Sequence, residues 1–444
     1  MFEALKGWTS AQKHVVAASY LGWTLDAFDF FLLVFVIKDV AAEFHSEIAN
    51  VSLALTLTLG LRSVGAFVFG RLADHFGRRP ILMFDVVLYS VLAFATAFSP
   101  SLTVFLVLRA LFGIAMGGEW GIGASLTMES VKPEARGFVS GLLQSGYPSG
   151  YLLASLVFFF LYPHIGWRGM FMVGLVPALL IFYIRRHVPE SPGWRRREKV
   201  SLATALGGPE LSIAALYIVS ITASIYLLPI IGPISFAITL LPVLGALVYF
   251  GKHWQLALYV ITLMTAFNFF SHGTQDLYPT FLQVQHKYEH NAVSAIAVIY
   301  NIGAIVGGLT FGILSQRYGR RRMIVTTALL SILAAPLWSF AETPVLLAAG
   351  AFLMQFFVQG CWGIIPAHLN ELSPNDARGT FPGTVYQLGN FIAASNAPLQ
   401  VAIATHFGGQ YSIALAGVAI TAAIVIAILA SLGREAKDAN LSVV

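Results

Sequence analysis

Charged side chains are scarce in this sequence of 444 residues: Asp, Glu, Lys and Arg make up 11% of it, whereas 57% is hydrophobic. The mean hydropathy of +0.76 is too high for a soluble domain, because one core could not bury so much apolar surface. Cysteine is nearly absent as well. Cys361 is the single cysteine, which excludes a disulfide framework and any metal site with several cysteine ligands.

Motifs of catalysis and nucleotide binding are also missing. The sequence contains neither HExxH nor GxSxG, and the glycines around Gly117 lie within an apolar run and lack the lysine of a phosphate-binding loop. We therefore expect no enzyme, no cofactor and no metal site. A cleavable signal peptide is not expected either, since the first apolar run, Val15 to Ile37, is too long and lacks a small-residue cleavage site.

Long apolar runs, by contrast, recur from end to end. A run of about twenty residues crosses a bilayer core of roughly 30 Å as a helix. The sequence predicts an all-α integral membrane protein with two sets of six spans and, between them, an apolar hairpin at 211–250. The first set of predicted spans is 15–37, 50–71, 81–99, 101–123, 139–162 and 167–185. The second set is 255–279, 291–315, 322–340, 344–368, 380–404 and 410–432.

Positive charge indicates how these spans are oriented. Of the 26 Lys and Arg, we place Lys38, Arg168 and Lys287 on one side of the membrane and Arg62 and Arg109 inside helices. The others share the opposite side, which the positive-inside rule identifies as the cytoplasm. The basic character therefore reflects topology and not nucleic-acid binding. We expect a multi-pass protein of the inner or plasma membrane with both termini in the cytoplasm.

The two sets of spans repeat at an offset of 242 residues. This offset carries Gly70 onto Gly312 and Arg79 onto Arg321, and it also carries Asp26 onto Asn268. Duplicated six-helix halves are an architecture of membrane transporters. The expected parts are a six-helix bundle at 1–188, a loop and hairpin at 189–253, and a second six-helix bundle with a short tail at 254–444.

The repeated segments, Gly70 to Arg79 and Gly312 to Arg321, resemble the loop signature of the major facilitator superfamily. The resemblance extends over nearly the whole chain and implies the major facilitator fold, with these loops acting as gates and a monomer as the working unit. In the second copy, Gln316 replaces the acidic residue of the signature. The gating residues that the resemblance implies are Gly70, Asp74, Arg78, Arg79, Gly312, Arg317, Arg320 and Arg321.

A motif in the seventh core span narrows the resemblance. Residues 268–280 are similar to the N-x-x-S-H-x-S/T-Q-D-x-x-x-T signature of lactate/pyruvate:proton symporters within the sialate:proton symporter family. The resemblance implies that a small anionic carboxylate crosses the bilayer together with protons. The central hairpin is instead a feature of the sialic acid transporters of that family, so a sialic acid:proton symporter is the alternative. A non-transporting sensor or a membrane enzyme is the third hypothesis.

Charged residues deep in apolar helices cost a few kcal/mol each, so they are expected to face a wet cavity or a partner. Arg62, near the middle of its span, offers paired donors that fit a substrate carboxylate, or it forms a salt bridge with Asp26 or Asp29. Those two carboxylates lie one turn apart and raise each other's proton affinity, which makes at least one a candidate proton carrier. Arg109 and Glu119 are expected either to take part in proton coupling or to hold helices together.

His272 and Asp276 lie four residues apart on one helix face, so they can hydrogen-bond and pass protons. Asn268 and Gln275 extend the same stripe of polar side chains. The expected substrate-binding residues are Arg62, Asn268, His272, Gln275, Tyr386, Gln387 and Asn390. The expected proton-coupling residues are Asp26, Asp29, Asp276, Arg109 and Glu119. Glycines at four-residue spacing are expected to let helices pack closely, namely Gly113, Gly117, Gly121, Gly146 and Gly150.

Overall fold

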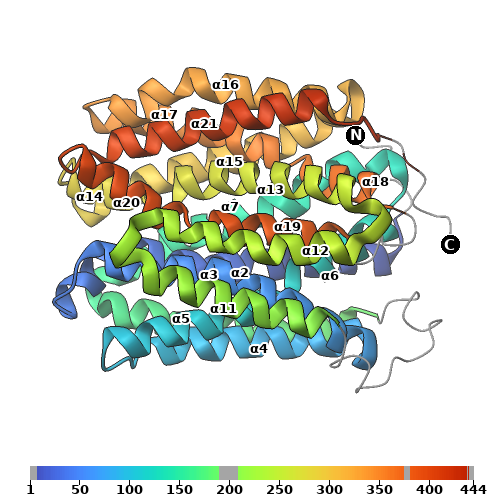
Figure 1. The fold of residues 1–444 in the computed structure, drawn as a ribbon, viewed down its shortest axis with the longest axis horizontal. Coiled ribbons are helices and arrows are strands. Elements are labelled where there is room, and N and C mark those ends of the chain that lie inside the picture. The colour runs from blue at the N-terminus through green and yellow to red at the C-terminus, as the bar shows by residue number, and fades with distance from the viewer. Residues whose placement is uncertain (1–7, 190–208, 375–380, 438, 440–444) are drawn as a thin grey trace.

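Helices dominate the part of the chain that the structure describes. The computed structural model describes residues 8–189, 209–374, 381–437 and 439, and within these ranges it contains no strand. Ten segments there are long and apolar enough to cross a bilayer. Figure 1 shows them running side by side along the longest axis of the molecule. The expected all-α membrane fold is confirmed.

The N-terminal half contains the six predicted spans. The fourth span is broken between Met116 and Glu119 and continues past the predicted end to Ser130, and Gly166, with φ of 60°, separates the fifth span from the sixth inside α7. The helices of this half are α2 (Ser10–Glu43), α3 (Ile48–Phe76), α4 (Arg78–Thr96), α5 (Leu102–Met116), α6 (Glu119–Ser130), α7 (Arg136–Val173), η2 (Val176–Leu179) and α8 (Leu180–His187).

The C-terminal half also contains six spans, three of which are broken into two helices. Its helices are α13 (Trp254–Gln275) with α14 (Tyr278–Val284), α15 (His290–Tyr318), α16 (Arg320–Phe340), α17 (Pro344–Trp362) with α18 (Ile365–Leu372), α19 (Phe381–Ala393) with α20 (Asn396–His406), and α21 (Tyr411–Leu432). The predicted hairpin is formed by α11 (Pro209–Ile231), η3 (Gly232–Thr239) and α12 (Leu240–Phe250).

The internal repeat reappears in the helix packing. Helix α2 packs on α7 as α13 packs on α19, and α3 packs on α5 as α15 packs on α17. Backbone details repeat as well: Gly77 and Gly319 both end a helix at positive φ, 107° and 100°, which a glycine adopts without strain. A Cβ at Gly65 would lie 1.8 Å from the carbonyl oxygen of Ile114, and one at Gly307 would lie 2.0 Å from that of Phe356. Each glycine therefore permits the same close helix crossing in its half.

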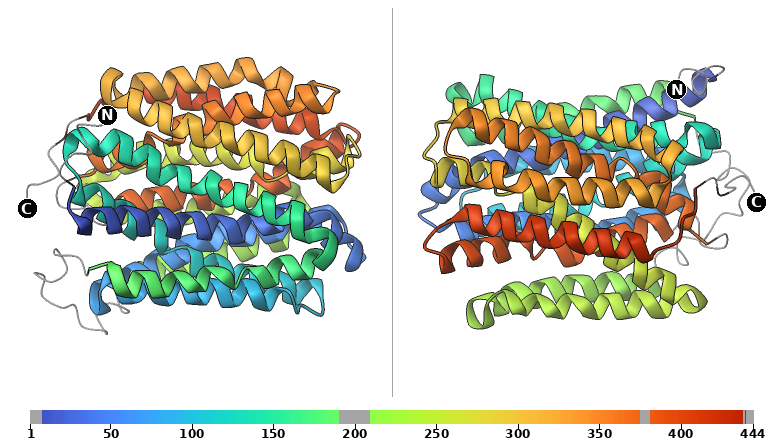
Figure 2. Two further views of the ribbon diagram at one scale, coloured as in Figure 1. Left: turned by 180° about the vertical axis from the view of Figure 1, so that it is seen from behind. Right: turned by 90° about the horizontal axis from the view of Figure 1, so that it is seen from above.

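The halves meet along two seams, α3 with α19 and α7 with α15. The α7–α15 seam is built on glycine, since a Cβ at Gly141 would lie 2.7 Å from the carbonyl oxygen of Gly308. The hairpin lies beside the other seam, outside the two bundles (Figure 2). Its helix α11 packs along α3 and its helix α12 packs on α13, while the rings of Tyr217 and Phe391 are 4.6 Å apart. The hairpin thus contacts both halves.

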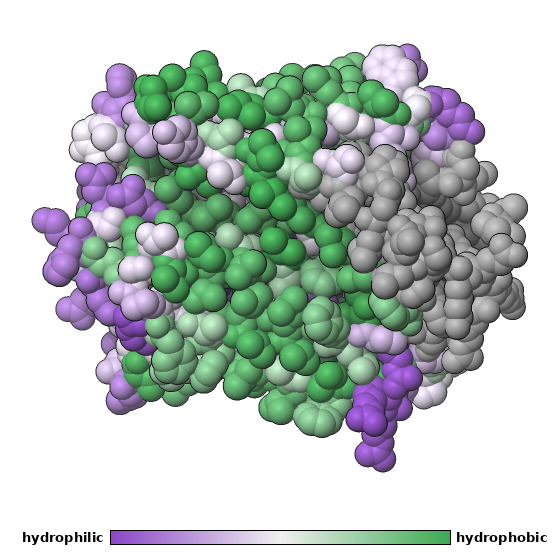
Figure 3. Space-filling view, turned by 60° about the horizontal axis from the view of Figure 1, so that its bottom comes forward, coloured by the Kyte–Doolittle hydropathy of each residue, from purple (hydrophilic) through white to green (hydrophobic). Residues whose placement is uncertain are grey.

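The N- and C-termini lie on the same side of the molecule (Figure 1), which we call the terminal face. The loops 44–47 and 285–289 lie on the opposite side, which we call the far face. Between the faces, the surface in Figure 3 is a continuous hydrophobic band, with hydrophilic residues at its edges. Large apolar side chains such as Leu333 and Val248 are exposed on the protein surface. Such a band matches the lipid-facing surface of a multi-pass membrane protein.

The gating segments are described in part. Arg320 donates to both carboxylate oxygens of Glu371, at 2.9 and 3.0 Å, and also to Gln316 at 2.8 Å. Arg321 donates to the carbonyl oxygens of Ala430 and Ser431. Gly312 packs against Gly137 and Gly141. Arg317 lies over the ring of Tyr318, and Arg79 donates to the carbonyl oxygen of Arg185. Gly70 and Asp74 lie on α3, but the surroundings of Gly70 and the side chains of Asp74 and Arg78 are outside the described part.

Candidate functional site

The site begins with one ion pair at the middle of the molecule. Arg62, at the centre of α3, donates from Nη2 to Oδ2 of Asp26 on α2 at 2.7 Å, and both side chains are 0% exposed. Nε and Nη1 of Arg62 and Oδ1 of Asp26 have no hydrogen-bond partner among the described residues. The indole of Trp23 lies beside the guanidinium, 5.4 Å from its carbon. Of the alternatives for Arg62, the structure contains the salt bridge to Asp26, and Nε and Nη1 of the guanidinium remain as unused donors.

Asp29 and Arg109 are a second acid and base that are buried in the N-terminal half, without a direct bond between them. The charge of Arg109 on α5 acts on Asp29, yet neither carboxylate oxygen of Asp29 and no guanidinium nitrogen of Arg109 has a hydrogen-bond partner in the described part of the chain. Arg109 lies over the ring of Phe112, 4.0 Å from its centroid. Buried charged groups normally have hydrogen-bond partners, so these two residues are exceptions among the described residues.

Glu119 and Asp85 add two more buried carboxylates. Glu119, at the start of α6, is 4% exposed and lines a small cavity together with Trp23 and Trp120. Asp85 on α4 is 1% exposed, and the charge of Glu119 acts on it. Asp85 was not among the predicted site residues, although it is a lone carboxylate in an apolar run, which is the same signal that pointed to Arg62.

The C-terminal half places its ionisable pair nearer the far face. Nδ1 of His272 lies 3.1 Å from Oδ1 of Asp276, so the predicted bond across one helical turn is confirmed. Both side chains are buried. The imidazole also contacts the N-terminal half, with its ring 5.9 Å from that of Phe30 and 6.4 Å from that of Tyr147. The pair therefore lies at the boundary between the halves.

Neutral amides form the rest of the C-terminal wall. Gln275 donates to Gln355 at 2.7 Å, and Gln355 donates to Thr274 at 3.0 Å. Gln359 donates to Ser271 at 3.3 Å. Gln355 and Gln359 were not predicted, although two glutamines four residues apart in an apolar span form a visible polar stripe. We call the three glutamines the amide wall.

The remaining predicted residues lie on α13 and α19. Asn268 donates to the carbonyl oxygen of Met264 in its own helix. Gln387 donates to the carbonyl oxygen of Gly117, at the break between α5 and α6, at 3.4 Å, and Asn390 donates to Gln387 at 3.1 Å. The ring of Tyr386 lies 4.2 Å from that of Trp120. Gln387 and Tyr386 thus connect α19 with the N-terminal half, at the level of Arg62 and its neighbour Ser63, which donates to the carbonyl oxygen of Gln387 at 2.7 Å.

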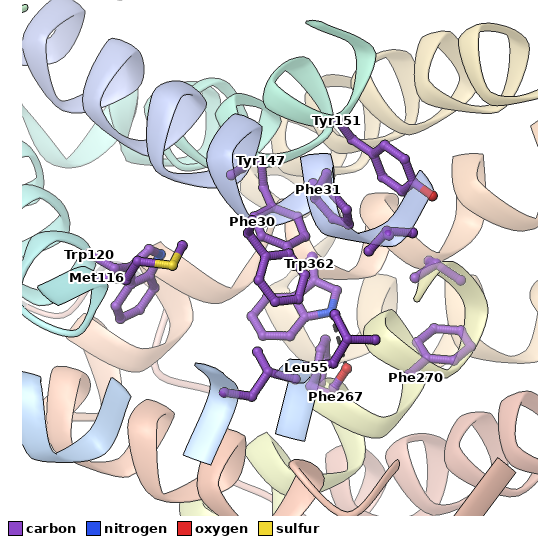
Figure 4. Close-up of a cluster of buried hydrophobic side chains, with 14 of the residues drawn as sticks. Phe30, Phe31, Leu55, Met116, Trp120, Tyr147, Tyr151, Phe267, Phe270 and Trp362 are labelled. Carbon is purple, nitrogen blue, oxygen red and sulfur yellow. Dashed lines mark hydrogen bonds between the residues drawn. The ribbon is translucent and has the colours of Figure 1, made fainter. Parts of the chain in front are cut away.

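Aromatic rings enclose the space between the halves. In Figure 4, Tyr147, Phe30 and Phe31 of the N-terminal half converge with Trp362 and Phe267 of the C-terminal half. Ring centroids of neighbouring pairs lie a few ångströms apart, for example 3.8 Å for Phe31 with Tyr151 and 5.3 Å for Trp23 with Tyr147. The polar groups named above therefore lie in an enclosed and largely dry region.

The halves also bond to each other near both faces. At the far face, Nε2 of His290 lies 3.8 Å from Oδ2 of Asp39. Toward the terminal face, Ser140 donates to the carbonyl oxygen of Gly363 at 2.8 Å and accepts from the backbone N–H of Ala367. Access from either side thus requires the halves to separate.

No metal centre is found among the described residues, where no three His, Cys, Asp or Glu side chains come together as ligands. The described site is instead an anion-compatible guanidinium, several carboxylates and a wall of amides between two duplicated bundles. Such a site fits reversible binding of a small polar molecule.

Relatives with this architecture are numerous. The chain is 30% identical over 400 residues to the carboxylic acid transporter protein homolog of Saccharomyces cerevisiae, covering 87% of its own length and 61% of that relative. It is 24% identical to the sialic acid transporter NanX of Escherichia coli, covering 93% and 91% of the two chains. The structure of the xylose transporter XylE from E. coli superimposes with a TM-score of 0.71 at 17% identity, covering 98% of this chain and all of that one.

A family model extends the likeness to both halves. It matches residues 20–270 and 258–442, so that each half of the duplicated fold lies within a match. The two matches together span nearly all the helices in which the site residues lie. The chain belongs to the Major Facilitator Superfamily.

Proposed function

We propose that this protein is a secondary active transporter that carries a small organic carboxylate across the membrane together with protons, by alternating access. The observation that carries the proposal is the Arg62–Asp26 pair, fully buried between the halves with guanidinium donors unused. A guanidinium binds carboxylates through paired donors, and a second carboxylate can take the place of Asp26. The relatives named for carboxylic acids and sialic acid support an acidic substrate.

The coupling to protons follows from charge balance. When Asp26 takes up a proton, Arg62 loses its partner, and a buried charge without a partner costs about 3–5 kcal/mol. A substrate carboxylate restores the balance by binding Arg62. By linkage, a substrate that binds Arg62 favours protonation of Asp26 to the same extent. One proton and one anion thus enter the site as a neutral set, which the enclosed aromatic surroundings tolerate best.

The amide wall supplies the contacts that distinguish one acid from another. Gln355 and Gln359 can reorient toward hydroxyl or carbonyl groups of a bound acid, since amides both donate and accept. His272 and Asp276, on the far-face side, are placed to exchange protons with the outside when the far face opens. We propose the terminal face as the cytoplasmic one, in agreement with the positive charges of the loops.

Uptake into proteoliposomes tests the proposal. The purified protein is reconstituted, and a panel of labelled carboxylates, including lactate, pyruvate and sialate, is offered with and without a pH gradient. We expect a small monocarboxylate to accumulate when the outside is acidic and a protonophore to abolish that accumulation. Uptake of none of the acids, or accumulation that ignores both the gradient and the protonophore, would contradict the proposal.

Sialic acid is the second candidate substrate. The amide wall favours it, because several amides in one wall suit a molecule with many hydroxyl groups. Competition separates the two candidates. If unlabelled sialate blocks labelled lactate uptake at lower concentration than unlabelled lactate does, the polyhydroxylated acid is the better substrate.

A further inference from the structure

Three buried carboxylates lie at increasing depth from the terminal face. At 1.5 Å per residue, Asp85 lies about 10 Å from the terminal-face end of α4 and Glu119 lies about 16 Å from that of α6. Asp26 lies deeper, about 24 Å from the start of α2. The spacing gives a stepwise path from the Arg62–Asp26 pair toward the terminal face.

The cavity beside Glu119 is lined mostly by apolar side chains, with a few polar groups among them. Both carboxylate oxygens of Glu119 and the indole nitrogens of Trp23 and Trp120, all of which line it, have no hydrogen-bond partner among the described residues. The cavity has room for about one water molecule. A water there would accept from an indole N–H and donate to the carboxylate, which gives it the two or more partners that a buried water requires.

Glycines make room for both acids. A Cβ at Gly22 would lie 1.9 Å from Oε1 of Glu119, and a Cβ at Gly118 would lie 3.2 Å from Oδ2 of Asp85. Leu82, one turn before Asp85 on α4, lines the same cavity. Glu119 thus lines the small cavity itself, and Asp85 lies one turn beyond a residue that lines it.

The surroundings of Asp85 are rich in titratable groups. Helix α3 brings Arg62, whose guanidinium is bonded to Asp26, and α6 brings Glu119. The elements packed against α4 carry many charged and titratable groups, among them Asp26 and Asp29 of α2, Arg62 of α3, Arg109 of α5, Glu119 of α6, Tyr147 of α7, and Tyr183, Arg185, Arg186 and His187 of α8, with Tyr89 on α4 itself. Within the described residues, Oδ1 of Asp85 has no hydrogen-bond partner. An acid that only holds helices together would be bonded to a neighbour.

We infer that Asp85 and Glu119 form a proton port, through which the proton that accompanies the substrate to Asp26 leaves toward the terminal face by way of water in the cavity. The inference rests on the proposed function and adds Asp85 to the residues that serve it. Only a proton moves: it passes from the Asp26 carboxyl to the Glu119 carboxylate, then to Asp85, and finally to water at the terminal face. Each donor returns to its carboxylate form, so no other species is consumed.

Two transport modes separate the port from substrate binding. Exchange of labelled for unlabelled substrate does not need the proton to leave, whereas net uptake does. In Asp85→Asn we expect net uptake driven by a pH gradient to fall about tenfold or more, while exchange stays within about twofold, and we expect Asp85→Glu to recover net uptake. The matched control is Glu47→Gln, an exposed carboxylate at the far face, which should behave as the unmodified protein. Unchanged net uptake and pH dependence in Asp85→Asn would overturn the port.

The unmodified protein, assayed in parallel, keeps the two hypotheses apart. If it shows no response to a pH gradient, the proposed symport fails, and the port is then judged without substrate. Infrared difference spectra between acidic and neutral pH should contain a protonated-carboxyl band that Asp85→Asn or Glu119→Gln removes. The Asp85→Glu variant should shift this band, and it replaces Asp85→Asn if that variant does not fold. A spectrum that none of these substitutions changes overturns the port.

Discussion

The two halves of the site differ in charge although they share one scaffold. In the N-terminal half, Asp26 and Asp29 lie where the C-terminal half has Asn268 and Ser271, and all four side chains are buried. A carboxylate in such a place needs a cation or a proton, whereas an amide or hydroxyl needs only a hydrogen bond. At these two positions the halves therefore share their geometry but differ in chemistry, with carboxylates in the N-terminal half and neutral polar groups in the C-terminal half.

The facing helices differ in a matching way. Gly113 and Gly117 of α5 correspond by the repeat to Gln355 and Gln359 of α17. A Cβ at Gly117 would lie 2.0 Å from the carbonyl oxygen of Arg62, so glycine is what brings α5 against the helix that carries the guanidinium. In the other half, the same positions carry the long amides that reach α13. One half uses these positions for close packing, and the other uses them for hydrogen bonds to α13.

Substitution of Arg62, the cation of the N-terminal half of the site, should have the largest effect on uptake. Arg62→Lys keeps the charge but loses the paired donors, and we expect uptake to fall about 100-fold or more, since losing a partner in a buried charge pair costs about 2–5 kcal/mol. Uptake is measured at equal amounts of inserted protein. The C-terminal counterpart of this position is Ala304, and Ala304→Ser should leave uptake within about twofold. Full activity in Arg62→Ala would remove Arg62 from the mechanism.

Substitution of Asp26 should come next. Asp26→Asn imitates the protonated acid, so substrate binding is expected to lose its pH dependence while net accumulation falls about tenfold or more. Binding is measured by tryptophan fluorescence or calorimetry at acidic and neutral pH. If binding in Asp26→Asn still strengthens on acidification as in the unmodified protein, the coupling proton resides elsewhere.

His272 tests whether the C-terminal half also handles protons. We expect His272→Ala to change the shape of the pH profile of uptake and to lower the rate about threefold to tenfold, because the bond to Asp276 is lost. His272→Gln, which retains a side-chain hydrogen bond but cannot titrate, is the companion variant. A pH profile that is unchanged in both variants would restrict proton coupling to the N-terminal half.

The amide wall should show the smallest effect. Gln359→Ala removes one neutral hydrogen bond, worth about 1 kcal/mol, so KM is expected to rise about fivefold with little change in kcat. The rise should be larger for hydroxylated acids than for pyruvate. Equal changes for both kinds of acid would indicate that Gln359 supports the helix pair and does not contact substrate.

Sequence reasoning located the spans well because their length and hydropathy are set by the bilayer. It also located the His272–Asp276 bond, since a spacing of four residues within one helix fixes the geometry locally. For Arg62 the sequence left two alternatives, because depth along a helix does not determine which neighbouring helix the side chain meets. The structure contains the pair with Asp26 and leaves the binding role as a prediction.

Contacts between helices account for most of what the sequence missed. Asp85, Gln355 and Gln359 were visible as polar residues in apolar runs, but nothing local said that they face the site. The rings that enclose the site, such as Tyr147 beside His272, come from spans far apart in the chain. The break between α5 and α6 was missed as well, because adjacent glycines pack helices as often as they interrupt them.

The hairpin has a mechanical consequence for any exchange between conformations. Its helix α11 lies along α3 of one half, and its helix α12 lies on α13 of the other. When the halves change their relative orientation, the angle between α11 and α12 must therefore change as well. The segment that connects α11 and α12 is η3, which begins at Gly232 with φ of 64°. A substitution that stiffens η3 would slow this change of orientation, although it would alter none of the predicted substrate-binding residues.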